Sequence, residues 1–175
     1  MANYNWEVNH NPNYPGRGNF EINYMHIATA YNSAGATLDA KYTWTPIDNY
    51  GAGDDGFGLE DEMLDKDSYR NAKGRLRRFV LDNTCANITF NTRYLFQEDM
   101  MALCEILDKG MSLDDGFCSH KERNVMVKYY NPNKNKYEIA ECYTPAPQWV
   151  TAGSWDVPRY NPTTIRFIDY GSKKD

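Results

Sequence analysis

The sequence predicts a mainly β protein, an antiparallel β-sandwich or barrel of about six to eight strands with one packed α-helix. Three observations predict this class: short segments alternate apolar with polar residues, turn residues separate them, and one segment repeats apolar residues at helical spacing. The chain has 175 residues, which suits one domain. We expect an extended arm over 1–19, where prolines block regular structure, and a single β-rich domain over 20–175.

The first half of the domain contains two predicted strands and a predicted loop. Residues 20–29, FEINYMHIAT, alternate in character and predict a strand. Residues 38–46, LDAKYTWTP, predict a second strand that Pro46 ends. Residues 48–67, DNYGAGDDGFGLEDEMLDKD, show no period and are rich in Gly and Asp, so we expect an acidic loop insertion there.

The middle of the chain contains the one expected helix. The segments RLRRFVL and TCANITFNTRYLF predict two strands on either side of DNT. Residues 96–111 follow, and their apolar stripe has helical spacing. The stripe consists of Phe96, Met100, Leu103, Cys104 and Leu107. Gly110 suits the end of this helix, because glycine is common where helices stop.

The last part of the chain predicts a hairpin and a closing strand. The hairpin comprises NVMVKYYN and KYEIAECYT, two alternating segments that PNKN joins with Pro and Asn in turn positions. Residues 163–171, TTIRFIDYG, alternate again and predict the final strand.

The charged residues form two adjacent blocks of opposite sign. Five basic side chains lie between Arg70 and Arg78, and seven carboxylates lie between Asp54 and Asp67. A nucleic-acid site would need a positive field and interleaved aromatics, but the net charge is −5 and Tyr69 is the sole aromatic within residues 67–78. Opposed blocks instead suit contacts between copies of one chain. The interface candidates are Arg70, Asn71, Gly74, Arg77, Arg78, Asp54, Asp55, Glu60, Asp61 and Glu62.

Motifs for catalysis or metal binding are weak. The tetrapeptide DDGF occurs at 54–57 and at 114–117, but neither copy has the spacing of a calcium-binding EF-hand loop. The three histidines stand beside no recognisable nucleophile motif. The cysteines lack CxxC spacing and are expected to be reduced, buried thiols; they are Cys85, Cys104, Cys118 and Cys142. We therefore expect no enzyme activity, no metal and no cofactor.

Two tryptophans allow two interpretations. Trp149 and Trp155 flank a proline-bounded stretch, and exposed tryptophans can form a platform that stacks on sugars. In the alternative, which we prefer, one tryptophan packs against the core and the other anchors its loop.

The order of segments from Leu38 to Gly171 resembles a family of short tail proteins from tailed bacteriophages. Its specific part is the pattern D-x-x-R-N-x-x-G-x-x-x-R, formed here by Asp67, Arg70, Asn71, Gly74 and Arg78. The strand that runs into the helix, the hairpin and the closing strand follow in the same order. Residues 1–37, 48–66 and 143–162 are longer than the resemblance leads us to expect, and they could dock a particular neighbour.

The resemblance implies a structural virion component, most simply a tail-tube, distal-tail or adaptor protein that assembles as a ring. The alternatives are a module at the tail tip that binds glycans or the host surface, and a structural protein of the head or neck. The implied partners are copies of the chain and neighbouring virion proteins. DNA could pass through such an assembly without sequence-specific binding. The implied location is the virion, after synthesis in the bacterial cytoplasm, and no apolar run approaches the ~20 residues of a membrane span.

Overall fold

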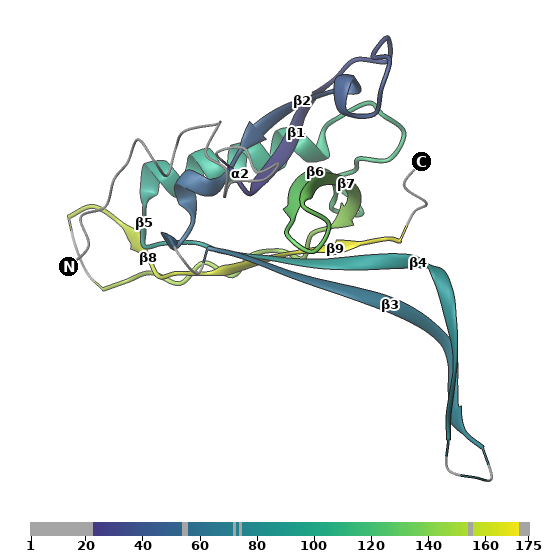
Figure 1. Cartoon of the computed structure of the whole chain (residues 1–175). Coiled ribbons are helices and arrows are strands. Elements are labelled where there is room, and N and C mark those ends of the chain that lie inside the picture. Colours follow the sequence, from purple (N-terminus) through teal and green to yellow (C-terminus); the bar gives the residue numbers. More distant parts are fainter. Residues whose placement is uncertain (1–22, 54–55, 72, 74, 154–155, 172–175) are drawn as a thin grey trace, which may run out of the picture.

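The computed structural model confirms the predicted fold class: the part of the chain that it describes is mainly β, antiparallel, with one α-helix packed on the sheet (Figure 1). It describes residues 23–53, 56–71, 73, 75–153 and 156–171, and only the backbone of 61–69 and 76–84. The predicted arm over 1–19 lies outside the described residues. Seven strands form one sheet in the order β2-β1-β6-β7-β9-β4-β3, and β5 pairs with β8 in a small second sheet.

The elements follow one another along the chain without a repeated unit. In chain order they are β1 (Met25–Tyr31), the 3-10 turn η1 (Asp39–Lys41), β2 (Tyr42–Pro46), the 3-10 turn η2 (Asp48–Tyr50), β3 (Phe57–Arg70), β4 (Leu76–Asn91), β5 (Leu95–Phe96), α2 (Gln97–Met111), β6 (Asn124–Asn131), β7 (Lys136–Tyr143), β8 (Arg159–Tyr160) and β9 (Thr164–Asp169). The predicted hairpin is β6–β7 and the predicted closing strand is β9. Both predictions are confirmed.

The large sheet bends between β7 and β9, and the core lies inside the bend. These two strands pair only through Cys142 with Asp169 and Tyr143 with Ile168, so the sheet turns a corner there. The buried core joins residues from both parts of the sheet with residues of α2. Strand β9 alternates exposed and buried residues, whereas the first four residues of β1 and of β6 are all buried. The central strands β1 and β6 are therefore covered on both faces, and β9 on one.

Helix α2 packs against β1 and β6, as its apolar stripe predicts. Leu103, Leu107 and Met111 are its buried apolar residues. Gly110 does not end the helix, which continues to Met111. Gly110 is buried, and a methyl group at its Cα would lie 2.9 Å from Cγ2 of Ile27 and 3.1 Å from the carbonyl oxygen of Ala28. The glycine therefore permits a close approach between α2 and β1.

Gly110→Ala is expected to lower the free energy of unfolding by about 1 kcal/mol, although alanine favours helices. The propensity gain of about 1 kcal/mol is outweighed because overpacking typically costs about 1–3 kcal/mol. Urea denaturation followed by circular dichroism would measure the change. A stabilised variant would show that α2 has room to move away from β1.

Residues 57–67 are a strand and not the predicted acidic loop. Strand β3 begins at Phe57 and pairs with β4 along its whole length, from Phe57 with Phe90 to Arg70 with Leu76. The prediction was wrong because alternation of apolar and polar residues reveals only those strands that have one buried face, and most of β3 has none. Beyond the residues of β3 that lie opposite 87–91 of β4, the hairpin has no described third strand and leaves the body of the protein, so no core selects an apolar face there (Figure 1).

Residues 76–91 form one strand, where two were predicted around DNT. The pairing of β4 with β3 is irregular near DNT. Met63 pairs with Thr84 and Asp65 pairs with Val80, so the three residues 81–83 lie opposite the single residue 64. Such bulges bend a ribbon and increase its twist. Figure 1 shows that the projecting hairpin bends sharply on its way to the tip.

The two predicted N-terminal strands are present but start later than expected. Strand β1 is described from Met25, and residues 20–22 lie outside the described residues. Residues 39–41 form the turn η1, so β2 begins at Tyr42.

Candidate functional site

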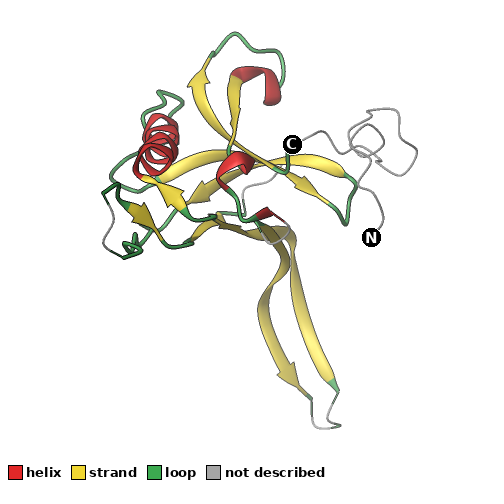
Figure 2. Cartoon of the chain, turned by 90° about the vertical axis from the view of Figure 1, so that its left-hand side faces the viewer, coloured by secondary structure: helices red, strands yellow, loops and turns green. Residues whose placement is uncertain are grey.

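The most distinctive feature of the structure is the part of the β3–β4 hairpin that projects from the body, residues 61–86, here called the ribbon. Strand β9 pairs with β4 only from Asn87 to Asn91, so within the described residues the ribbon has two strands and no third neighbour. Its first arm, residues 61–70, spans roughly 30 Å at about 3.3 Å per residue. Figures 1 and 2 show it extending away from the other elements. Isolated two-stranded hairpins are only marginally stable in water, so the ribbon depends on its root in the sheet more than the other strands do.

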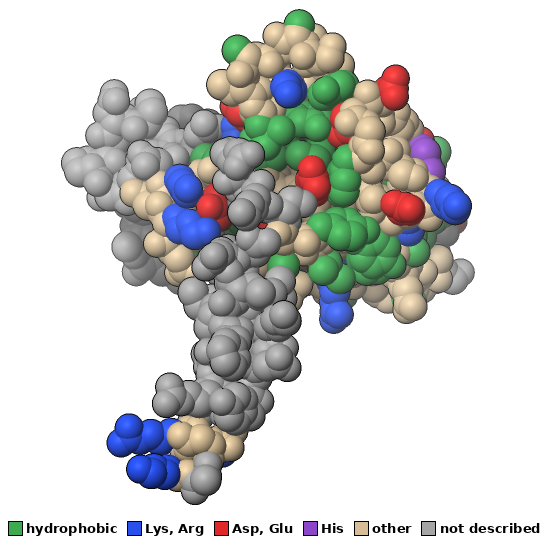
Figure 3. Space-filling view, turned by 90° about the vertical axis from the view of Figure 1, so that its right-hand side faces the viewer, with side chains coloured by type: hydrophobic (Ala, Val, Ile, Leu, Met, Phe, Trp, Pro, Cys, Tyr) green, Lys and Arg blue, Asp and Glu red, His purple; other side chains and the backbone are tan. Residues whose placement is uncertain are grey.

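The tip of the ribbon is basic. Arg70, Lys73 and Arg75 are exposed and stand around the turn that joins β3 to β4. Figure 3 shows Lys and Arg side chains gathered at this end of the molecule. Arg77 and Arg78 follow in β4, where their backbones pair with Tyr69 and Ser68. The structure thus brings the predicted basic candidates together, while Gly74 lies outside the described residues.

Asn71 shapes the turn at the tip. Its side-chain oxygen Oδ1 accepts hydrogen bonds from the backbone amides of Lys73, at 3.1 Å, and Arg75, at 3.0 Å. The backbone amide of Asn71 donates to the carbonyl oxygen of Arg75 at 3.0 Å. Short polar side chains commonly hold turns in this way. The Asn of the R-N-x-x-G segment is therefore a structural residue that positions the basic side chains around it.

Asn71→Ala should loosen the tip and leave the body unchanged. The substitution removes two exposed hydrogen bonds, and each is worth about 0.5–1.5 kcal/mol at most in such a place. Backbone amide exchange at 73–75 should accelerate, while exchange in β6 and β9 stays as in the unmodified chain. Asn71→Asp is the matched control, since a carboxylate oxygen can accept the same bonds. Unchanged exchange in the alanine variant would contradict the role given to Asn71.

The acidic candidates lie along the same hairpin. Glu60 is exposed and stands in β3 where the ribbon begins, opposite Asn87. Asp61 and Glu62 are the next residues of that strand, and only their backbones are described. Asp54 and Asp55 lie outside the described residues. The described acidic candidates and the basic block therefore belong to one hairpin, with the acidic residues along β3 and the basic residues at the tip.

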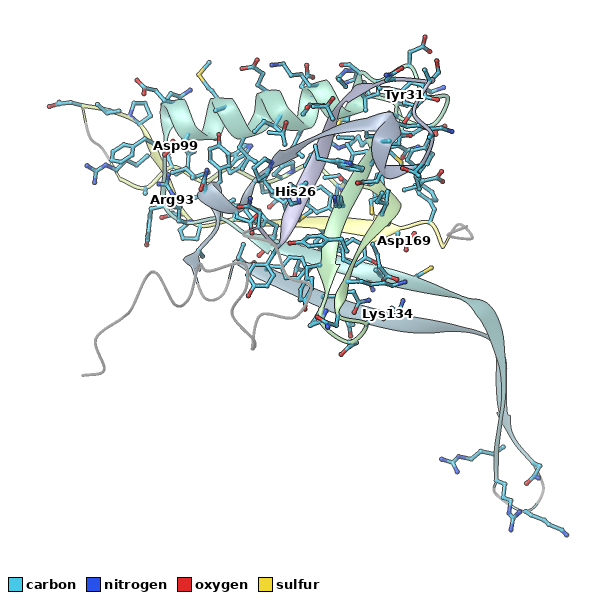
Figure 4. The ribbon with its side chains drawn as sticks, turned by 45° about the horizontal axis from the view of Figure 1, so that its top comes forward. His26, Tyr31, Arg93, Asp99, Lys134 and Asp169 are labelled. Atoms are coloured by element: carbon cyan, nitrogen blue, oxygen red, sulfur yellow. The ribbon has the colours of Figure 1, made fainter. Side chains whose placement is uncertain are left out.

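The root of the ribbon is fixed by an aromatic stack and by one buried carboxylate. Phe57 stacks on Tyr24, the residue before β1, with ring centroids 5.4 Å apart. Asp169, at the end of β9, accepts a bond of 3.4 Å from the amide of Ala86, where β4 leaves the sheet (Figure 4). These contacts tie the base of the ribbon to β1 and β9, so the ribbon leaves the body in a defined direction.

A cavity of about 530 Å³ lies beside this root, and Asp48 is the one carboxylate among the described residues that line it. The two carboxylate oxygens accept the backbone amides of Tyr24, at 2.7 Å, and Met25, at 3.1 Å. Burial raises the pKa of Asp48, and the two backbone amides act in the opposite direction. The hydrogen bonds of this carboxylate join η2 to the start of β1, so Asp48 stabilises the fold at this place.

Asp115, in the second DDGF segment, also has its oxygens occupied within the chain. Oδ1 accepts the amides of Phe117, at 2.9 Å, and Cys118, at 2.7 Å. Oδ2 accepts the hydroxyl of Tyr42, at 3.0 Å, and the Cys118 thiol, at 3.2 Å. Burial acts to raise the pKa of Asp115, but these hydrogen bonds outweigh it and lower the pKa. Among the described residues, no group of three or more His, Cys, Asp or Glu side chains is placed to hold a metal ion.

Trp149 packs within the protein, in agreement with the interpretation that we preferred. It lies half-buried against the core, and its ring meets that of Tyr160 edge-on with centroids 6.3 Å apart. Trp155 lies outside the described residues. The cysteines form no disulfide in the structure; Cys142 is buried as expected, whereas the other three are only half-buried.

The helix carries one surface feature that the sequence analysis did not single out. Its outer side presents three exposed carboxylates around an exposed methionine; the residues are Glu98, Met101, Glu105 and Asp108. Their spacing of three and four residues could have indicated this face, because such residues are neighbours on a helix. Arg93 links the helix start to η2: it contacts Asp99 at 2.8 Å and donates to the carbonyl oxygen of Asn49 at 3.1 Å (Figure 4).

The chain was also compared with known proteins. No helix in the described part of the chain is long and apolar enough to cross a membrane. No curated protein matches the sequence significantly. Among solved structures, a chain of the tail of an empty GTA particle with C6 symmetry has 11% sequence identity and a TM-score of 0.38; the match covers 85% of this chain and 91% of that one. A family model matches residues 32–170, and the chain therefore belongs to the family of unknown function DUF6711.

Proposed function

We propose that this chain is a structural component of a tailed-bacteriophage virion, and specifically a tail protein that assembles as a ring with copies of itself. The ribbon is the observation that carries the proposal. It is a long two-stranded element with an exposed basic tip, and a neighbouring subunit would supply the surface that it lacks.

The charge arrangement supports contacts between identical copies. A head-to-tail interface brings a different surface of each copy against the next, and it closes into a ring where the rotation permits. Surface ion pairs contribute only about 0–1 kcal/mol each, so the basic tip would set orientation and register. Apolar surface at the interface would supply most of the affinity.

The role is architectural and not catalytic. The carboxylates of Asp48 and Asp115 are both occupied by hydrogen bonds within the chain. The resemblance through Asp67, Arg70, Asn71, Gly74 and Arg78 supports a place in the tail. The partners would be copies of the chain and adjoining virion proteins. DNA would pass through the assembly without sequence-specific contact.

Sedimentation velocity at several protein and salt concentrations tests the proposal. We expect species larger than the 20.2 kDa monomer, which become more abundant with protein concentration and less abundant with salt, because screening weakens charge contacts. Negative-stain images of the largest species should show rings. A monomer under all conditions, together with failure to join purified virion proteins, would contradict the proposal.

A further inference from the structure

The outer face of α2 is an acidic stripe with an apolar centre. Glu98, Met101, Glu105 and Asp108 are exposed and follow one another at intervals of three or four residues along the helix. Met101 is 59% exposed, so its apolar side chain is available for contact between the carboxylates. The stripe borders a shallow depression of about 690 Å³ that Met100 and Cys104 also line.

The carboxylates of the stripe are only partly compensated by their neighbours. Lys109 contacts Glu105 at 2.7 Å, and this hydrogen bond lowers the pKa of Glu105. His120 lies 3.5 Å from Asp108. Glu98 stands in the first turn of the helix, where a negative charge is favourable. The stripe keeps an excess of negative charge around Met101, which suits a basic partner with aliphatic side-chain stems.

The ribbon tip has the complementary character but cannot reach this stripe in its own chain. Arg70, Lys73 and Arg75 are exposed, and arginine and lysine combine a positive end with an apolar stem. Figures 1 and 2 both show the tip projecting away from the body, with α2 on the body itself. An encounter between the two surfaces therefore requires a second copy.

We propose that the acidic stripe of α2 binds the basic ribbon tip of a second copy of this chain. The occupant follows from charge complementarity: three exposed cations at the tip match three exposed carboxylates on the stripe. Met101 lies between the carboxylates and packs against the aliphatic stems of the tip. The contact is heterologous, with tip on one copy and helix on the next, so it can repeat around a ring. This inference rests on the proposed self-association and names its receiving surface.

A charge-swap experiment tests the inference directly. The first variant reverses the stripe, with Glu105→Lys and Asp108→Lys. The second reverses the tip, with Arg70→Glu and Arg75→Glu. Each should raise the dissociation constant for self-association about tenfold or more, since like charges then face each other. The chain that carries all four substitutions should regain self-association, because its tip and stripe are again opposite in sign.

The control makes the same change of charge away from the stripe, with Asp114→Lys and Asp156→Lys, both at exposed positions. It should associate like the unmodified chain. Thermal unfolding of every variant identifies any that fails to fold. If the stripe reversal does not fold, Glu105→Gln with Asp108→Asn replaces it. This neutral variant should also raise the dissociation constant for self-association, but by a smaller factor. The measurement is sedimentation velocity at low salt.

The outcomes separate this inference from the proposed function. If the unmodified chain associates but stripe reversal has no effect, or if the four-fold variant does not recover, the stripe is not the receiving surface and self-association stands. If the unmodified chain stays monomeric, this inference fails, and the proposed function fails with it only if the chain also does not join purified virion proteins.

Discussion

A chain in which Asn-Gly replaces residues 62–85 will remain folded but will no longer assemble. The replacement removes nearly all of the ribbon and joins Asp61 to Ala86, which are cross-strand partners. Asn-Gly is the favoured two-residue connection between paired antiparallel strands. The pairs from Phe57 with Phe90 to Asp61 with Ala86 remain, as does the pairing of β4 with β9.

Both parts of the expected result, the retained fold and the lost assembly, have a physical reason. The body keeps its core, because Ala86, Ile88 and Phe90, the buried residues of β4 among those whose side chains are described, all remain. Assembly fails because the basic tip and the two-stranded arm are absent. Sedimentation velocity should give a monomer at all concentrations, and the melting temperature should stay close to that of the unmodified chain.

Two observations would count against this prediction. Rings formed by the shortened chain would show that assembly depends on another surface. If the shortened chain unfolds, the tip variant Arg70→Glu with Arg75→Glu, which leaves the ribbon in place, provides the same test of assembly.

The second large effect is expected at Asp115. Asp115→Ala removes a carboxylate that accepts four hydrogen bonds and joins β2 to the loop after α2. Bonds to charged groups contribute roughly 1.5–3 kcal/mol each when well sheltered, and Asp115 is only half-buried. We expect a loss of about 3 kcal/mol in the free energy of unfolding at pH 7. Asp114→Ala, at the exposed neighbouring residue, should cost under about 0.5 kcal/mol.

The effect at Asp115 should depend on pH in one direction. The pKa of this carboxyl is lower in the folded chain than its ordinary value of 3.8. A lowered pKa contributes stability that is present above the unfolded pKa and is lost as pH falls through the folded pKa. The difference between the unmodified chain and Asp115→Asn should therefore be constant near neutrality and shrink below about pH 4. Urea denaturation at several pH values measures it; a difference that grows in acid would contradict the assignment.

The elements that sequence reasoning predicted well are those with a buried face. Helix α2 was predicted because Leu103 and Leu107 repeat at helical spacing and are buried, and the hairpin β6–β7 because its residues alternate against the core. Strand β3 was missed, since only its first residues lie over the body and the rest has no apolar face that alternation could reveal. DNT was interpreted as a break between strands, but the chain passes through it as a bulge.

The candidate site was predicted in part. The basic block was identified from its charge, and the structure places it at the tip. The turn-forming role of Asn71 was not predicted, because an R-N-x-x-G pattern does not tell which backbone amides the side chain reaches. The partner for the basic block was expected in the acidic residues before it. The described acidic residues belong to the same hairpin as the basic block. The exposed carboxylates of α2 are an alternative acidic surface on the body of the protein.

No described strand pairs with the outer edge of β3, and this has a consequence for the period before assembly. An open strand edge can add another strand from any chain that offers one, and uncontrolled addition of this kind leads to aggregation. Glu60, Asp61 and Glu62 stand on this edge strand, so two copies that met edge to edge would bring like charges together. Acidic residues at this place would keep newly made subunits apart in solution and leave docking at the basic tip as the favoured route of association.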